Sequence, residues 1–197
     1  MPLPTQLCFA SNNAHKLDEI RPLLPAGLSL LSLADIGCHE ELPETQDTLA
    51  GNARQKAEYV RQHYGVACFA DDTGLEVTAL DGAPGVYSAR YAGPARSADD
   101  NVAKLLRELA GHADRSARFC TVVALAAADG TTQEFAGEVA GRINTDARGA
   151  GGFGYDPVFE LPNGKTMSEL TRDEKSALSH RGHAFRAMLP QLIAAGA

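Results

Sequence analysis

The sequence predicts an α/β protein with a mixed central sheet flanked by helices, and two patterns support this prediction. Short apolar runs typical of buried strands alternate with segments whose apolar residues recur at helical spacing. The first run, residues 7–10, stops at the polar residues 11–13, and helical spacing then continues up to Pro25. Strand, polar loop and helix in this order present a ligand-binding loop at the carboxyl end of a strand.

The other elements follow in chain order. A strand is expected over residues 28–33, and a helix from Thr48 to Tyr64 with Gly65 as its C-terminal cap. The apolar run 66–70 predicts a strand that ends at the pair Asp71-Asp72. The next segments predict an ordered loop over 82–93 and a helix that begins at Ser97. Two strands are then expected over 118–128 and 132–142, joined by an Asp129-Gly130 turn. The chain continues with a Gly-rich loop over 149–157, a strand over 158–160, a helix with the capping box Thr171 and Glu174, and a last helix.

Size, charge and cysteine usage restrict the class of protein. The chain of 197 residues suits one domain, which we take as residues 1–197 with two lobes and a cleft between them. The formal charge of −7 disfavours nucleic-acid binding, because such a field repels polyanions. We expect no membrane segment, since the apolar run 122–128 is too short to span a bilayer, and residues 1–5 lack signal-peptide features. Four cysteines without metal-ligand spacing predict reduced thiols in a cytoplasmic protein.

The pair Asp71-Asp72 is the leading candidate for chemistry. Two adjacent carboxylates after a buried strand repel each other unless a cation compensates them. Mg²⁺ suits such a place, because it prefers one or two carboxylates together with substrate phosphates. The alternative is that the pair only begins a turn toward Gly74. A second pair, Asp99-Asp100, lies at an expected helix start, where acidic residues stabilise the helix dipole, and we interpret it as structural.

Two further groups in the first third of the chain could contact a phosphorylated ligand. The loop 11–16 contains small polar residues and Lys16 where a helix begins, although taken alone it is better explained as a helix N-cap. Asn52 and Lys56 share one face of the expected helix, and Glu44 precedes that helix, where it could complete a metal site with Asp72. A solvated acidic loop and a surface lysine are the alternative.

Two groups near the carboxyl end could contact a base. Residues 151–157 place Phe153 and Tyr155 between glycines, so that a purine could approach the backbone and stack on a ring. The alternative is a tight turn whose rings fill the core. Lys175 and Arg181 could pair with phosphate, and His180 and Arg181 could donate to a base carbonyl. The alternative is a basic surface turn.

Together these motifs resemble the dITP/XTP pyrophosphatase family, also called the inosine triphosphate pyrophosphatase or Ham1-like family. The resemblance covers almost the whole chain, in order, through residues 11–16, 44–45, 52–53, 56–57, 70–75, 82–91, 152–157 and 175–182. The chain departs from many members at Gln46-Asp47, where they carry Gly after the Glu-Thr pair, at Leu49, where they carry Phe, and at Gly51, where they carry Glu. Because of these departures, the sequence does not predict the conformation of the loop that follows Glu44-Thr45.

The resemblance implies Mg²⁺-dependent hydrolysis of dITP, ITP and XTP to the monophosphate and pyrophosphate, by a homodimer with an elongated sheet and a deep substrate cleft. It implies that Asp72 is the proton acceptor and a metal ligand, and that Glu44 is a second metal ligand, with Asp71 as a further candidate. Substrate contacts are implied for Ser11, Asn12, Asn13, Ala14, His15, Lys16, Asn52, Lys56, Thr73, Phe153, Gly154, Tyr155, Asp156, Lys175, His180 and Arg181. Lys16 and Lys56 would hold the triphosphate, and Phe153 would stack on the base.

Three other functions stay open on the sequence. The chain could be a pyrophosphatase of modified pyrimidine nucleotides, a nucleotide sensor without catalysis, or an RNA-binding module. Asp72, Glu44 and Lys16 disfavour a sensor, because a sensor has less need of a general base. The charge of −7 and the lack of a basic stripe disfavour RNA.

Overall fold

The computed structural model describes the backbone of residues 6–194 and the side chains of residues 6–192. The helices are α1 (Ala14–Ile20), α2 (Leu49–Tyr64), α3 (Ala98–Glu108), α4 (Arg172–Leu178) and α5 (His180–Ala194), with short 3₁₀ helices at Arg21–Leu23, Ala34–Ile36, Thr78–Leu80, Ser88–Arg90 and Met167–Glu169. The strands are β1 (Gln6–Phe9), β2 (Ser29–Leu31), β3 (Cys68–Val77), β4 (Pro84–Gly85), β5 (Ser116–Ala126), β6 (Thr132–Ile143) and β7 (Phe159–Glu160). The expectation for residues 1–5 falls outside this range, and none of the described helices is both long and apolar enough to cross a membrane.

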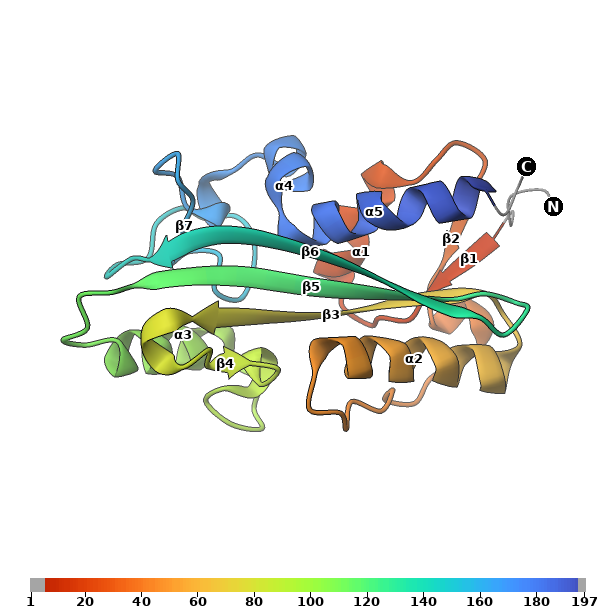
Figure 1. Ribbon diagram of the computed structural model, residues 1–197, viewed down its shortest axis with the longest axis horizontal. Coiled ribbons are helices and arrows are strands. Elements are labelled where there is room, and N and C mark those ends of the chain that lie inside the picture. The colour runs from red at the N-terminus through yellow and green to blue at the C-terminus, as the bar shows by residue number, and fades with distance from the viewer. Residues whose placement is uncertain (1–5, 195–197) are drawn as a thin grey trace. The chain divides into compact units, whose positions relative to one another are not determined.

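The seven strands form a mixed sheet in the order β2-β1-β3-β5-β6-β7, with β4 paired to β3. β1 runs parallel to β2 and to β3, whereas β4 and β7 run antiparallel to β3 and β6. Helices lie against the sheet, as Figure 1 shows, so the predicted α/β class with a mixed, helix-flanked sheet is confirmed.

The chain divides into two compact units. Unit 1 comprises Met1–Asp72, Thr121–Gly137 and Arg181–Ala197, and unit 2 comprises Thr73–Cys120 and Glu138–His180. Each unit has cores of its own among the described residues: two apolar clusters belong to unit 1 and one to unit 2. The strands β3, β5 and β6 contribute residues to both units.

Unit 1 has helices on both faces of its strands. Successive side chains of a strand point to opposite faces, so the residues of β1 and β3 divide into two sets. One set packs against α1 and α5 in a cluster that includes Leu7, Phe9, Phe69, Ile20 and Phe185. The other set packs against α2 in a cluster that includes Cys8, Cys68, Ala70, Ala53, Ala57 and Val60. Figure 1 shows α1 and α5 on one side of these strands and α2 on the other.

The core of unit 2 lies between α3, the strands and the long loop that precedes α4. It includes Leu75, Leu105, Phe119, Tyr155 and Phe159. The predicted helix signals of this unit are confirmed: Ser97 caps α3 by accepting from the Asp100 N–H at 3.2 Å, and Thr171 and Glu174 form a capping box at α4. The acidic pair Asp99-Asp100 lies in the first turn of α3, as the structural interpretation requires.

One predicted boundary is wrong, and it bears on the site. The strand expected to end at Ala70 continues to Val77, so Asp71 and Asp72 lie inside β3 rather than at its end. The cause is pairing that the local sequence does not reveal, because β4 adds to the second half of β3 with Leu75 opposite Gly85. The pair therefore follows the alternation of a strand, and its two side chains project to opposite faces.

Candidate functional site

The alternation of β3 separates the two adjacent carboxylates. Phe69 belongs to the cluster with α1 and α5, and Asp71, two residues later, contacts those same helices. Ala70 belongs to the cluster with α2, and Asp72, two residues later, contacts α2. Asp71 and Asp72 are adjacent in sequence, but their carboxylates contact different helices and different polar groups.

Asp71 is buried among cations of unit 1. Its side chain is 1% exposed, and its oxygens Oδ1 and Oδ2 accept from Lys16 Nζ and Arg181 Nε, each at 2.9 Å. The Arg181 Nη1 donates in turn to Glu19 of α1. Burial alone would raise the pKa of Asp71, but the charges of Lys16, Arg181 and Lys56 outweigh it and hold that pKa well below its usual range.

Asp72 lies with Glu44 and two residues of α2. Asn52 Nδ2 donates to Asp72 Oδ2 at 3.1 Å, and Lys56 Nζ lies 2.6 Å from Glu44 Oε1 and 3.9 Å from Asp72 Oδ1. The same Nζ donates to the Asp71 carbonyl oxygen at 2.7 Å. Burial raises the pKa of Asp72, the charge of Glu44 raises it further, and Lys56 and Lys16 only partly offset this. The pKa values of the two neighbouring carboxyl groups are thus shifted in opposite directions.

Glu44 and Asp72 form a donor set that fits Mg²⁺. Both carboxylates lie around one cationic group, the Lys56 ammonium, so both can face a single positive centre. Mg²⁺ is commonly held by one or two carboxylates, with water and substrate phosphates completing its coordination. Within the described part of the chain, no group of three or more His, Cys, Asp or Glu side chains could hold a metal ion by itself. Glu44 and Asp72 would thus be the two protein ligands of such an ion, with substrate and water as the others.

The first predicted loop is built as a helix cap. Asn13 caps α1 through its Oδ1, which accepts from the backbone N–H groups of His15 and Lys16 at 3.0 and 3.3 Å. Ser11 in turn accepts from the Asn13 N–H at 3.2 Å. Asn12, Ala14 and His15 are exposed. The cap orients α1 so that Lys16, one turn in, reaches Asp71.

Unit 2 holds a second cluster of predicted site residues. Asp156 is 3% exposed, and its Oδ2 accepts from Lys175 Nζ at 2.6 Å and from the Phe153 N–H at 2.8 Å. The Lys175 ammonium lies 4.8 Å from the centre of the Phe153 ring, within the range of a cation–π contact. Asp156 thus joins a loop aromatic to a helix cation, and Gly154, with φ of 61°, supplies the positive φ of the turn.

The remaining predicted residues have mixed positions. Tyr155 is 5% exposed in the core of unit 2, where its hydroxyl donates to the Ser88 carbonyl at 2.9 Å, so its ring fills the core as the alternative interpretation held. His180 is 4% exposed and stacks on Phe119, with centroids 4.6 Å apart and planes 19° apart. Thr73 is half-buried in β3, directly after Asp72.

Two residues that contact the predicted site residues, Glu19 and Phe119, were not among the candidates from the sequence. Glu19 bonds Arg181, and helical spacing could have found it, because Glu19 follows Lys16 by three residues on α1. Phe119 supports His180 from a strand far away in sequence, and no local signal marks it.

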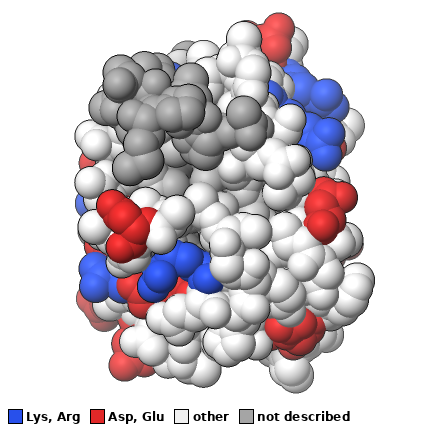
Figure 2. Space-filling model, turned by 90° about the vertical axis from the view of Figure 1, so that its right-hand side faces the viewer, with Lys and Arg blue, Asp and Glu red and all other residues white. Residues whose placement is uncertain are grey.

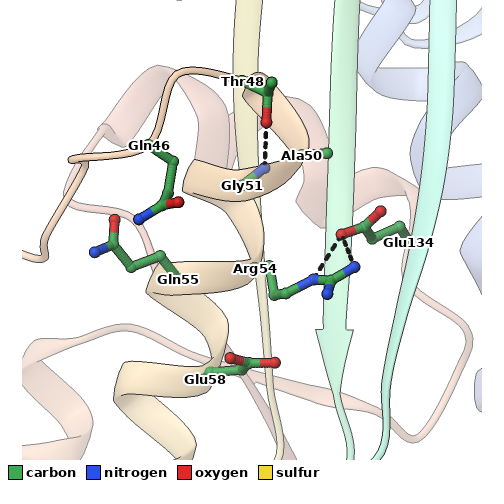
Figure 3. A pocket seen from close by; sticks show the side chains of 8 residues that line it. All are labelled: Gln46, Thr48, Ala50, Gly51, Arg54, Gln55, Glu58 and Glu134. Carbon is green, nitrogen blue, oxygen red and sulfur yellow. Dashed lines mark hydrogen bonds and ion pairs between the residues drawn. The ribbon is translucent and has the colours of Figure 1, made fainter.

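A pocket of about 470 Å³ lies elsewhere in unit 1 (Figure 3). It is lined by Gln46, Thr48, Ala50, Gly51, Arg54, Gln55, Glu58 and Glu134. Figure 3 shows Arg54 paired with Glu134, at 2.7 Å, beside the Thr48 cap of α2. Arg54 follows Asn52 by two residues, so the two side chains leave α2 in nearly opposite directions. None of the predicted site residues lines the pocket, although the N–H of its lining residue Gln46 donates to Asn52 Oδ1 at 2.9 Å.

Comparison with known proteins shows the family to which this chain belongs. The model of the Ham1 family matches residues 7–191. A Flavobacterium johnsoniae protein named dITP/XTP pyrophosphatase is 50% identical over 190 residues, which cover 96% of this chain and 98% of that one. A Porphyromonas gingivalis protein of the same name is 51% identical over 193 residues, with the same shares covered. The structure of the Staphylococcus aureus Ham1 protein matches with a TM-score of 0.88 and 36% identity, over 96% of this chain and 99% of that one. With its motifs, its fold and nearly its whole length shared, this chain belongs to the Ham1 family.

Proposed function

We propose that this protein hydrolyses non-canonical purine nucleoside triphosphates (dITP, ITP and XTP) to the nucleoside monophosphate and pyrophosphate, and so cleanses the nucleotide pool. The observation that supports it most directly is the unit 1 cluster, in which Glu44 and Asp72 lie with Lys56. Two carboxylates and cations suit a metal-bound triphosphate. The names of the relatives point to the same reaction.

Each part of the substrate has a proposed partner. Lys16, Lys56, Asn52 and the loop Ser11–His15 would bind the triphosphate, with Thr73 as a further contact. Mg²⁺, held by Glu44 and Asp72, would neutralise charge on the phosphates as the bond between the α- and β-phosphates breaks. The base would meet unit 2, where it would stack on Phe153 beside Gly154, Tyr155 and Asp156.

Asp72 is the proposed general base. Asn52 fixes the orientation of its carboxylate through the 3.1 Å hydrogen bond, and burial raises its pKa. A carboxylate with these properties can orient the attacking water and take its proton. Lys56, between Glu44 and Asp72, keeps both carboxylates in place.

Selectivity should follow from the 6-position of the purine. Hypoxanthine and xanthine present a carbonyl acceptor there, whereas adenine presents an amino donor. His180 and Arg181 are the proposed donors, and a buried donor left unsatisfied by adenine costs about 1–3 kcal/mol. GTP shares the 6-carbonyl, so refusal of GTP must depend on its 2-amino group.

Hydrolysis of ITP, XTP, GTP and ATP with Mg²⁺ and with EDTA tests the proposal. We expect monophosphate and pyrophosphate from ITP and XTP only with Mg²⁺, and slow turnover of GTP and ATP. Asp72→Asn should lower kcat by about 10²–10⁴-fold. Asp99→Asn removes a carboxylate of the other acidic pair and serves as the matched control, with unchanged activity.

The same panel separates the rival functions. Equal rates with ITP and GTP would refute nucleotide-pool cleansing, and preference for modified pyrimidines would favour the broader pyrophosphatase. Nucleotide binding without pyrophosphate release would indicate a sensor. For RNA binding, the face in Figure 2 offers no support, because its basic side chains are scattered among acidic and uncharged ones.

The proposed enzyme acts as a cytoplasmic homodimer. The family resemblance supports the dimer, and the free thiols of Cys8, Cys38, Cys68 and Cys120 fit a reducing compartment. Light scattering after size-exclusion chromatography tests the dimer.

A further inference from the structure

Three cations from three helices of unit 1 converge on one residue. Asp71 Oδ1 accepts from Lys16 of α1, Oδ2 accepts from Arg181 of α5, and the carbonyl oxygen accepts from Lys56 of α2. The distances are 2.9, 2.9 and 2.7 Å. Each of these cations belongs to the motifs proposed to bind the substrate.

The geometry also gives Asp71 a different role from Asp72. A divalent ion at the Asp71 carboxylate would lie beside two cations that are already bonded to it, and like charges in a buried site repel strongly. Asp72, on the other face of β3, has a second carboxylate nearby in Glu44, which favours a divalent ion. Adjacent acidic residues thus divide between holding cations of the protein and holding the metal.

We propose that Asp71 is a positioning residue that does not ligate the metal. Its carboxylate holds Lys16 and Arg181 in the places from which they contact the nucleotide, and its carbonyl holds Lys56. Two of the three nitrogens of Arg181 are fixed, Nε by Asp71 and Nη1 by Glu19, so the guanidinium plane is set. This inference rests on the proposed function for the identity of the ligand.

The test measures binding rather than turnover. The probe for the cations is inorganic tripolyphosphate, titrated calorimetrically, and the probe for the metal is Mn²⁺, followed by electron paramagnetic resonance. Asp71→Asn should weaken tripolyphosphate binding about ten- to a hundredfold, the effect of one charged hydrogen bond, and leave Mn²⁺ binding unchanged. Asp72→Asn is the matched variant at the next position, and it should weaken Mn²⁺ binding instead.

The sign of the effect makes the test decisive. Removing a negative charge would by itself strengthen binding of an anion, so weaker binding isolates the lost position of the cations. Because Asp71 acts in part through Lys16, the effects of Asp71→Asn and Lys16→Met should be less than additive in a double-mutant cycle. Unchanged or tighter tripolyphosphate binding, full additivity, or weakened Mn²⁺ binding would each overturn the proposal.

Two further variants keep the proposal testable if Asp71→Asn does not fold. Asp71→Glu keeps the charge but displaces it by one methylene, and it should also weaken tripolyphosphate binding. The double variant Asp72→Asn/Glu44→Gln leaves Asp71 in place and should lose Mn²⁺ binding, whereas retained binding would show that Asp71 ligates the metal. Absence of ITP hydrolysis in the wild type would refute the proposed function alone, because neither binding readout depends on turnover.

Discussion

At the scale of single residues, Asp71 and Asp72 should affect stability in opposite directions. The Asp71 pKa is depressed by its cations, so its contribution to folding is present above the usual Asp pKa and is lost as pH falls through the folded-state value. Asp71→Asn should therefore lower the free energy of unfolding at pH 7 by about 3–5 kcal/mol, because it leaves Lys16 and Arg181 buried without their carboxylate. The difference in the free energy of unfolding between the wild type and Asp71→Asn should decrease as the pH is lowered.

Asp72 should behave in the reverse sense. Burial raises its pKa in the fold, so its charge opposes folding once pH rises through that value. Asp72→Asn should raise the free energy of unfolding at pH 7 in EDTA while activity is lost, and the gain should vanish in acid. Urea unfolding of both variants from pH 3 to pH 7 measures this, and equal effects of the two substitutions would contradict it.

The sequence located the two carboxylates, but it did not predict that their side chains project to opposite faces of a strand. The pair was located from an apolar run followed by two carboxylates, a local pattern. Its division between two faces depends on β3 continuing past Asp72, and that depends on β4. The role of Asp71 became apparent only from cations that come from residues 16, 56 and 181, which no local pattern connects.

At the scale of elements, the loop that precedes β7 depends on the missing side chain of Gly152. This glycine has φ of 75°, and a Cβ there would collide with the Asp156 carboxylate. Gly152→Ala should displace Asp156 from Phe153 and Lys175, and should lower the ratio of ITP to ATP turnover. Gly154→Ala is the matched control, since Gly154 also has a positive φ, of 61°, but an added Cβ would meet nothing within 4 Å.

The comparison isolates the collision from backbone strain. Both alanines should cost about 1 kcal/mol of stability through the left-handed backbone, whereas only Gly152→Ala should change selectivity. Steady-state kinetics with ITP and ATP, together with thermal unfolding, provides both readouts. An equal loss of selectivity in the two variants would indicate that strain, not Asp156, explains the effect.

Elements were predictable where their signals are local. The helix α2 has the expected bounds because Thr48 caps its start and Gly65, with φ of 67°, ends it in the left-handed conformation that favours glycine. The α4 capping box and the turn between β5 and β6 were equally local. The length of β3 was not, since strands are completed by partners distant in sequence.

At the scale of the whole molecule, the two units have separate cores and separate clusters of site residues. The carboxylates and lysines proposed for the triphosphate belong to unit 1, and Phe153, Asp156 and Lys175 belong to unit 2. The sequence could not show this division, because each unit is assembled from segments that alternate along the chain. The residues proposed to contact the substrate are therefore drawn from segments of both units.

Binding of substrate fragments should reveal this division. Lys56→Met removes the cation between Glu44 and Asp72, so it should weaken tripolyphosphate binding about tenfold or more and leave inosine binding unchanged. Lys175→Met removes the cation over Phe153, so it should weaken inosine binding and spare tripolyphosphate. Because Lys56 belongs to unit 1 and Lys175 to unit 2, their effects on ITP binding should add in the double variant. Calorimetry with the three ligands measures all of these, and a Lys175→Met variant that loses tripolyphosphate as strongly as Lys56→Met would show that Lys175 does not act on the base alone.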